Sequence, residues 1–198
     1  MVKHKRLIKQ VLWSGGMDST YLVQKLLKEG NRVEAFYIDI KNNVEKGQRE
    51  RAAIEKMLPF FNGKDFSFKR LVSIEMFDSS VRLRRAQLPF FIFGAMHLHG
   101  PVSLGVVKDE ELTKEIPDVQ AIVHTFNRFR DNPLIIEFPL LELSKAEIYR
   151  QIDPFLKQRI TFCQNHGPDR CGECKPCKMM KAAVPNSIHF SRGAVCRD

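Results

Sequence analysis

Apolar and polar residues follow two different periods along this chain. Short runs rich in β-branched and aromatic residues alternate with longer segments in which apolar residues return every three or four positions. The expected strands cover residues 7–13, 33–38, 66–72, 101–107 and 134–138, and the expected helices 17–29, 45–58, 88–99 and 119–130. Strands that alternate with helices predict an α/β fold, in which a mainly parallel, five-stranded, doubly wound sheet is covered on both faces.

Prolines and apolar spacing refine the helices. Pro59 is expected to close the helix over 45–58 or to begin its exit, because its ring clashes with the preceding turn. Pro89 is expected in the first turn of the helix over 88–99. The last of these helices has apolar side chains that helical spacing predicts to face inward: Ile122, Val123, Phe126 and Phe129.

Two polar segments bear on the ligand-binding side of the fold. Residues 74–87 carry the basic run Arg82 to Arg85, which fits either an exposed loop or the lining of a cleft. Ser144 is followed three positions later by Glu147, which is the spacing of a capping box, so a helix is expected to begin at Lys145.

Length and composition indicate a single globular domain. A chain of 198 residues with 43% hydrophobic residues can bury a substantial core. We expect residues 1–158 to form the α/β core and residues 159–198 to form a C-terminal segment packed in the same domain. No apolar run is long enough to span a bilayer, and the basic N-terminus is not followed by a signal-peptide core. The expected location is therefore the cytoplasm, with no membrane partner.

The chain is basic, with a formal net charge of +9. Such a charge permits an anionic partner such as a nucleic acid. Scattered basic residues on a solvated surface are the commoner explanation, so a nucleic-acid partner is possible but not favoured. The apolar face of the helix expected over 119–130 could serve the core or a homodimer interface equally.

The most informative stretch lies after the first expected strand, where Ser14 to Thr20 read Ser-Gly-Gly-Met-Asp-Ser-Thr. Glycines allow a tight turn and a close approach of the backbone to a ligand. The N–H groups of the following helical turn, together with the helix dipole, form an anion site. Ser14, Ser19 and Thr20 add hydroxyl donors, and Asp18 can cap the helix or hold a metal that accompanies phosphates. The alternative is an ordinary strand-to-helix turn. The spacings of the Walker and dinucleotide-binding motifs are absent.

Two more residues lie where expected strands end. Asp39 follows the second strand, and Gly105 lies near the end of the fourth. Ligands bind at the carboxyl edge of open parallel sheets, and a glycine there lets a ligand approach the backbone. Both residues are therefore candidates for the binding site.

Four of the five cysteines form a group with the spacing of a metal site. The group consists of Cys163, Cys171, Cys174 and Cys177. The last three form two overlapping C-x-x-C spacings that share Cys174, and seven residues separate Cys163 from Cys171. In a cytosolic protein such a group indicates metal binding rather than disulfides. Four thiolates close a tetrahedral shell, so a structural zinc knuckle is expected, with an iron–sulfur cluster as the alternative. His166 could replace one cysteine, and Cys196 has no partner nearby in the sequence.

The Ser14 to Ser19 stretch resembles the signature of the PP-loop ATP pyrophosphatase superfamily. In that superfamily the loop holds the pyrophosphate of ATP while a carboxylate or carbonyl oxygen is adenylated. The loop marks only the superfamily, and the loop together with the cysteine group resembles the 7-cyano-7-deazaguanine synthases, the QueC family. Those enzymes convert 7-carboxy-7-deazaguanine, ATP and ammonia to a nitrile through an adenylate and an amide. Further similar segments are Asp39 with residues 47–54, Gly105-Val106 with Pro117-Asp118, and residues 143–148.

The resemblance implies roles for individual residues. It implies binding of ATP or its pyrophosphate by Ser14, Gly15, Gly16, Met17, Asp18, Ser19, Thr20, Asp39 and Gly105. Asp18, near Mg²⁺, and Lys145, which would neutralise charge at the reacting phosphorus, are implied as catalytic. Gln48 and Asp118 are implied to bind the deazapurine. Zinc would be held by the four clustered cysteines.

Three segments differ from the family pattern. Residues 40–47 are longer and more charged, Thr161-Phe162 and Gln164-Asn165 replace an expected aromatic pair, and residues 178–181 lack an expected arginine. Because these segments flank the expected base pocket, an alternative is a related enzyme that passes the activated deazaguanine to a protein amine. A tRNA-modifying PP-loop enzyme and a non-enzymatic nucleotide-binding protein are further alternatives.

Overall fold

The computed structural model describes residues 7–40, 44–74, 92–108, 110–163 and 171–184. Within these residues the strands are β1 (Ile8–Leu12), β2 (Arg32–Ile40), β3 (Phe66–Ile74), β4 (Gly100–Ser103) and β5 (Leu134–Glu137). They form one sheet in the order β3-β2-β1-β4-β5, and each neighbouring pair is parallel. The predicted α/β fold with a parallel five-stranded sheet is thus confirmed.

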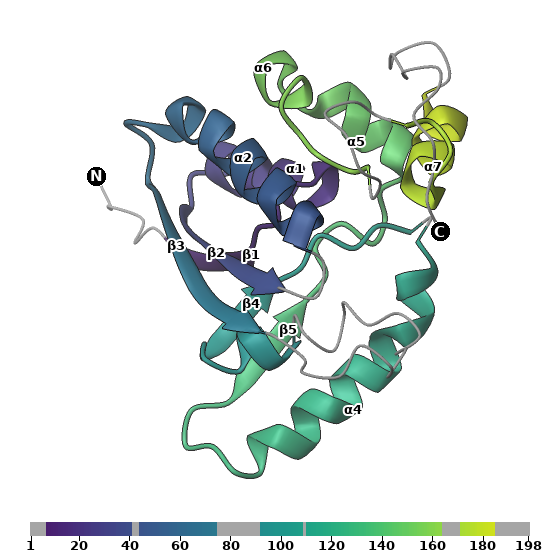
Figure 1. Cartoon of the computed structure of the whole chain (residues 1–198). Coiled ribbons are helices and arrows are strands. Elements are labelled where there is room, and N and C mark those ends of the chain that lie inside the picture. Colours follow the sequence, from purple (N-terminus) through teal and green to yellow (C-terminus); the bar gives the residue numbers. More distant parts are fainter. Residues whose placement is uncertain (1–6, 41–43, 75–91, 109, 164–170, 185–198) are drawn as a thin grey trace.

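Helices cover both faces of this sheet (Figure 1). They are α1 (Met17–Lys28), α2 (Val44–Phe61), α4 (Ile116–Asn127), α5 (Lys145–Gln151), α6 (Pro154–Lys157) and α7 (Lys175–Ala183), with a 3-10 turn η1 (Glu111–Glu115). Side chains of β2 alternate between the two faces, as the pleat requires. Val33, Ala35 and Tyr37 join the hydrophobic cluster under α1 and α2. Phe36 and Ile38 join the cluster under α4.

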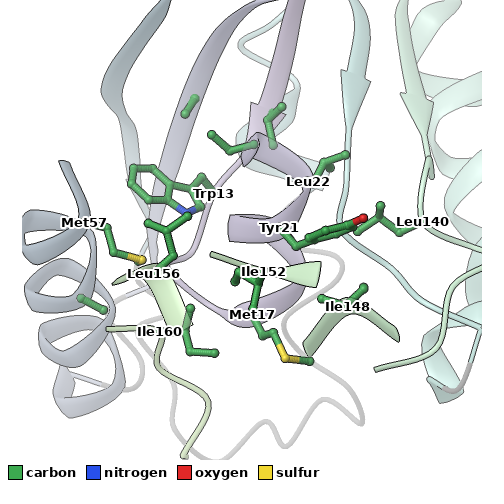
Figure 2. Close-up of a cluster of buried hydrophobic side chains, with 14 of the residues drawn as sticks. Trp13, Met17, Tyr21, Leu22, Met57, Leu140, Ile148, Ile152, Leu156 and Ile160 are labelled. Atoms are coloured by element: carbon green, nitrogen blue, oxygen red, sulfur yellow. The ribbon is translucent and has the colours of Figure 1, made fainter. Parts of the chain in front are cut away.

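The larger cluster joins the end of β1 to the C-terminal helices (Figure 2). Trp13 makes edge-to-face contacts with Phe61, Phe66 and Phe68, at centroid distances of 5.5, 5.7 and 5.5 Å. Residues of α5, α6 and the segment after α6 pack beside α1, including Ile148, Ile152, Leu156 and Ile160. This packing brings the second half of the chain to the helix that follows the glycine turn.

Several expected boundaries differ from the structure. Of the two expectations for Pro59, closure of the helix is wrong, because α2 continues to Phe61; Pro59 lies in its last turn, where the exit from the helix begins and a proline removes only one backbone hydrogen bond. The fourth strand ends at Ser103, so Gly105 lies in the loop that follows it. Most of the 74–87 segment and the start of the helix expected over 88–99 lie outside the described residues, while residues 92–95 are helical.

The predicted inward face of α4 is partly wrong. Val119 and Val123 are buried, but Ile122 is 44% exposed and Phe129 is 83% exposed. The helix begins at Ile116 and ends at Asn127, so Phe129 lies beyond it. Helical spacing predicts which residues share one face of the helix. It does not determine how much of that face the sheet covers, and therefore which of those residues are buried.

The strand order reverses between β1 and β4, where loops leave neighbouring strands toward opposite faces. In open parallel sheets ligands bind outside the carboxyl ends of the strands at such a point. The glycine turn follows β1 and Gly105 follows β4. No helix among the described residues combines the length and apolar character that a membrane crossing requires.

Candidate functional site

The turn between β1 and α1 has the geometry of an anion site. Gly15 has a φ of 73°, which favours glycine. A Cβ atom there would also lie 3.1 Å from the Glu50 carbonyl oxygen, so the turn packs directly on α2. Gly16 is the N-cap of α1 and provides no side-chain cap. The first N–H groups of α1 thus lack a side-chain cap, and they can donate to a phosphate.

Two serine hydroxyl groups flank this turn. The Ser14 N–H donates to Ser19 Oγ at 3.3 Å, and the two Oγ atoms are 3.3 Å apart. Ser19 Oγ also donates to the Gly16 carbonyl oxygen at 3.3 Å. These distances are longer than the usual 2.9–3.0 Å of N–H···O bonds and 2.7–2.8 Å of O–H···O bonds, so both hydroxyls can turn toward a ligand at little cost.

Thr20 and Met17 have different surroundings from the serines. Thr20 is fully buried, and its hydroxyl accepts from Trp13 Nε1 at 2.9 Å. Its side chain faces the core, so it cannot contact a phosphate in this structure. Met17 belongs to the hydrophobic cluster but also lines the cavity described below.

Gly105 holds the loop after β4 against the first turn of α1. A Cβ atom at this position would lie 2.7 Å from the Ser19 backbone nitrogen and 2.8 Å from the Asp18 carbonyl carbon. Real Cβ atoms do not approach backbone so closely, so a larger residue would push the loop away from the glycine turn. Gly105, Ser14 and Ser19 also line a cavity of about 90 Å³. The walls of this cavity are mainly apolar.

Lys145 joins two carboxylates beside the glycine turn. Its Nζ atom lies 2.7 Å from Asp18 Oδ2 and 2.8 Å from Glu110 Oε1. Lys145 is the first residue of α5, and the predicted capping box of Ser144 and Glu147 is confirmed. Sequence reasoning missed Glu110. It could have been found from the acidic run after β4, because that run follows a strand at the ligand-binding edge of the sheet.

Burial and charge act against each other in this group. Burial lowers the pKa of Lys145, but Asp18 and Glu110 outweigh it, and the net shift is upward. Burial, together with the charge of Asp18, raises the pKa of Glu110 despite the lowering effect of Lys145. At neutral pH with all three groups ionised, two carboxylates and one ammonium leave a net negative charge. A cation would therefore be stabilised here.

The residues fit a divalent cation of the kind that accompanies ATP. Asp18 Oδ1 is buried and has no hydrogen-bond partner among the described residues. Such an atom is costly unless a ligand satisfies it. Mg²⁺ prefers carboxylate oxygens and the oxygens of substrate phosphates, so Asp18 and Glu110 are the residues that would hold it.

The glycine turn and this charged group share one cavity of about 190 Å³, which we call the phosphate cavity. One part is formed by the turn and the charged group, and the rest by α2 and the segment around α7. Its lining residues are Ser14, Gly16, Met17, Asp18, Lys46, Glu50, Glu110, Lys145, Thr161, Phe162, Cys163, Pro176, Met179 and Met180.

Three residues expected at the site lie elsewhere. Asp39 is buried, but Arg51 Nη1 lies 2.7 Å from its Oδ1 and Arg70 binds its Oδ2, so both oxygens are neutralised by arginines. Gln48 and Asp118 are exposed, on α2 and α4. None of the three is among the described residues that line the two cavities.

The four clustered cysteines meet as predicted. Their Sγ atoms all lie within 4.8 Å of one another, with Cys171 to Cys177 at 3.9 Å and Cys163 to Cys174 at 4.0 Å. A tetrahedral zinc with Zn–S bonds of about 2.3 Å separates its sulfurs by about 3.8 Å, so the group fits this ion. Burial opposes ionisation of Cys171, but hydrogen bonds from the N–H groups of Cys174 and Glu173, together with those from neighbouring thiols, outweigh it and lower the pKa of Cys171 to about 6. His166 and Cys196 lie outside the described residues.

The cysteine site forms part of the cavity wall and is not a separate structural site far from the cavity. Cys163 and its neighbour Phe162 line the phosphate cavity. The helix α7, which carries Cys177, contributes Pro176, Met179 and Met180. Metal binding would therefore fix the wall that faces the glycine turn.

Comparison with known proteins gives distant similarities, of which one is described here. No family model matches the chain. A stretch of 80 residues is 29% identical to a protein named 7-cyano-7-deazaguanine synthase from Lysinibacillus sphaericus (strain C3-41). The match covers 37% of this chain and 36% of that protein, so the chain spans little more than a third of its relative. The name of the relative is that of an enzyme, and it agrees with the resemblance carried by the motifs.

Proposed function

We propose that this protein is an ATP-dependent ligase that adenylates 7-carboxy-7-deazaguanine or a related deazapurine carboxylate. Amidation by ammonia and dehydration would then give the nitrile, with release of AMP and pyrophosphate. The observation that carries this proposal is what meets in one cavity: a helix N-terminus without a side-chain cap, a buried lysine, and a carboxylate oxygen that has no hydrogen-bond partner in the described part of the chain. The printed name of the distant relative supports the choice of substrate.

Each part of the cavity has a function in this scheme. The pyrophosphate of ATP would accept from the first N–H groups of α1 and from Ser14 and Ser19. Lys145 would stabilise the charge that develops as the substrate carboxylate oxygen attacks the α-phosphorus and pyrophosphate leaves. Asp18, with Glu110, would hold Mg²⁺, which lowers the charge on the phosphates when it is bound.

The smaller apolar cavity suits the adenine ring. It lies at the carboxyl ends of β1, β2 and β4 and shares Ser14 with the phosphate cavity. Phe36, Ile38 and Val106 provide an apolar lining there. Adenine bound in this cavity would have its phosphates beside the glycine turn.

We assign structural zinc to the cysteine site. Four thiolates complete a tetrahedral shell and leave no open position for chemistry. The assignment also weighs against a tRNA thiolase, because such an enzyme needs reactive cysteines and the four described cysteines are committed to one group.

Mass spectrometry of a reaction with protein, ATP, magnesium, ammonia and 7-carboxy-7-deazaguanine tests the proposal. We expect the nitrile together with AMP. AMP without nitrile would place the activated base on another acceptor, such as a protein amine. A reaction that forms no AMP would contradict adenylation of this carboxylate.

A further inference from the structure

A third carboxylate in the phosphate cavity, beside Asp18 and Glu110, has no task in the activation chemistry. Glu50 lies on α2, two residues after Gln48, and its side chain is only 12% exposed. It lines the cavity together with Phe162 and Met179, and it belongs to a different helix from Asp18 and Lys145. A buried carboxylate is costly to maintain, and such groups are concentrated at functional sites.

The carboxylate of Glu50 is held by two side chains of the described structure. Its Oε2 atom accepts from the hydroxyl of Tyr37 at 3.1 Å, and its Oε1 atom lies 3.4 Å from Lys46 Nζ. An ionised carboxyl group has about four acceptor positions, so these two partners leave room for further donors. The Lys46 contact is also longer than the 2.7–2.9 Å of a strong charge-assisted bond.

Rigid elements fix the position of this carboxylate. Tyr37 is buried on β2 and its hydroxyl lies 3.4 Å from the Gly47 carbonyl oxygen. The Glu50 carbonyl oxygen is packed against Gly15, so the turn of α2 that carries Glu50 touches the glycine turn itself. Sites held by strands and helices in this way are more exact than sites on loops.

The rest of this part of the cavity is apolar and rich in sulfur. Phe162, Pro176, Met179 and Met180 form the wall. Methionine sulfur and aromatic rings both make favourable contacts with the face or edge of a flat ring. A flat heterocycle against this wall would have an edge near a carboxylate.

We infer that Glu50 is the specificity-determining residue of this cavity, and that it accepts from the paired N–H donors of a 2-amino-4-oxopyrimidine edge, as in guanine. The ring N–H and the exocyclic amino group of this edge are parallel donors. The two oxygens of a carboxylate can accept one hydrogen bond from each, as they do from the two parallel N–H groups of an arginine guanidinium. The inference rests on the proposed function and deepens it. Gln48 and Asp118 are exposed and line neither cavity, so neither can make this contact in the structure.

Calorimetry of ligand binding without turnover tests this inference. The two ligands are 7-carboxy-7-deazaguanine and the same compound without its 2-amino group. The proteins are the full-length wild type, Glu50→Gln, and the matched control Glu55→Gln, whose residue is exposed on the same helix. Glutamine keeps an oxygen for Tyr37 but presents an N–H group to the ligand donors.

We expect removal of the amino group to weaken binding to the wild type by about 10- to 100-fold, the range for a paired contact to a base edge. Glu50→Gln should weaken binding of the complete ligand by a similar factor. Removal of the amino group should then have little further effect on this variant. Glu55→Gln should behave as the wild type, and the affinity for ATP should be the same in all three proteins.

Other outcomes would overturn the inference. If the two losses multiply independently, or if Glu50→Gln binds the complete ligand as the wild type does, Glu50 does not contact the amino edge. A parallel loss of ATP affinity and melting temperature would show that Glu50 only supports the fold. If the wild type binds no deazaguanine and releases no AMP with it, the proposed function itself fails and the inference with it.

Discussion

The ammonium nitrogen of Lys145 lies 2.7 Å from Oδ2 of Asp18, although 127 positions separate the two residues. Each belongs to the first turn of a helix, Asp18 in α1 and Lys145 in α5. A lysine in a first turn is unfavourable beside the positive end of the helix dipole. Asp18 and Glu110 offset this cost, and together they place a cation where the phosphates of ATP are proposed to bind.

Asp18→Asn should abolish ATP turnover without unfolding the protein. The amide keeps the shape of the side chain but loses the charge that a metal ion and Lys145 need, so we expect a loss of AMP release of about 100-fold or more, comparable to loss of an electrostatic group at a transition state. Glu110 still pairs with Lys145, so the melting temperature should change little. Asp118→Asn, at an exposed position, is the control. Unchanged turnover in Asp18→Asn would contradict the assignment.

Lys145→Met should change the dependence of stability on pH at the alkaline end. The folded state raises the pKa of Lys145 above its ordinary value of 10.5. Its contribution to stability is therefore fully present below 10.5, and it is lost as the pH rises through the higher folded pKa. Urea unfolding from pH 7 to 11 should show a wild-type decline in the upper part of this range that the variant lacks. Parallel curves for the two proteins would argue against the buried ion pairs.

Glu50→Gln should stabilise the protein at neutral pH while it weakens ligand binding. Burial raises the pKa of Glu50 above its ordinary value of 4.5, and the lowering effects of Lys46 and Tyr37 do not compensate. For a carboxyl group with a raised folded pKa, the folded state holds the proton more tightly. Wild-type stability from this group therefore falls as the pH rises from 4.5 through the folded pKa. The advantage of the variant in thermal melts should be present above this window and vanish below it. A less stable variant at pH 7 would show that the charged form supports the fold.

Gly105→Ala should disturb both folding and nucleotide binding. The added methyl group meets the backbone of Ser19 and Asp18, which cannot move without shifting the start of α1. Overpacking of this kind costs about 1–3 kcal/mol of the free energy of unfolding. Gly30→Ala is a useful comparison, because that position has open space and only a φ of 81° to oppose the substitution. It should lose some stability but retain the wild-type affinity for ATP, and equal affinities in all three proteins would contradict the role of Gly105.

Metal analysis should find about one zinc per chain, held by four sulfurs. Removal of the metal by a chelator should lower the melting temperature, because Met180 and Val184 connect the cysteine segment to the main hydrophobic cluster. It should also weaken binding of the deazapurine more than binding of ATP, since the segment forms only one wall of the phosphate cavity. Iron with visible absorbance would overturn the zinc assignment.

Features that depend on near neighbours in the chain could be predicted from the sequence. The alternation of strands and helices, the turn at Gly15-Gly16 and the capping box at Ser144 all follow from side-chain periods and backbone preferences that act over a few residues. The cysteine spacing likewise predicted a four-sulfur group, because each C-x-x-C pair brings two thiolates together locally.

The tertiary structure alone decided which distant groups became partners. Glu110 reaches Lys145, which also binds Asp18, because β4 lies beside β1, and no local pattern specifies that pairing. Asp39, placed correctly at the end of a strand, is occupied by Arg51 and Arg70 instead of a ligand. The exposure of Ile122 and Phe129 was also decided by the tertiary structure, because the area that a neighbouring element covers determines whether an apolar side chain is buried. Local propensity is set within a few residues, whereas pairing and burial depend on contacts made when the whole chain has packed.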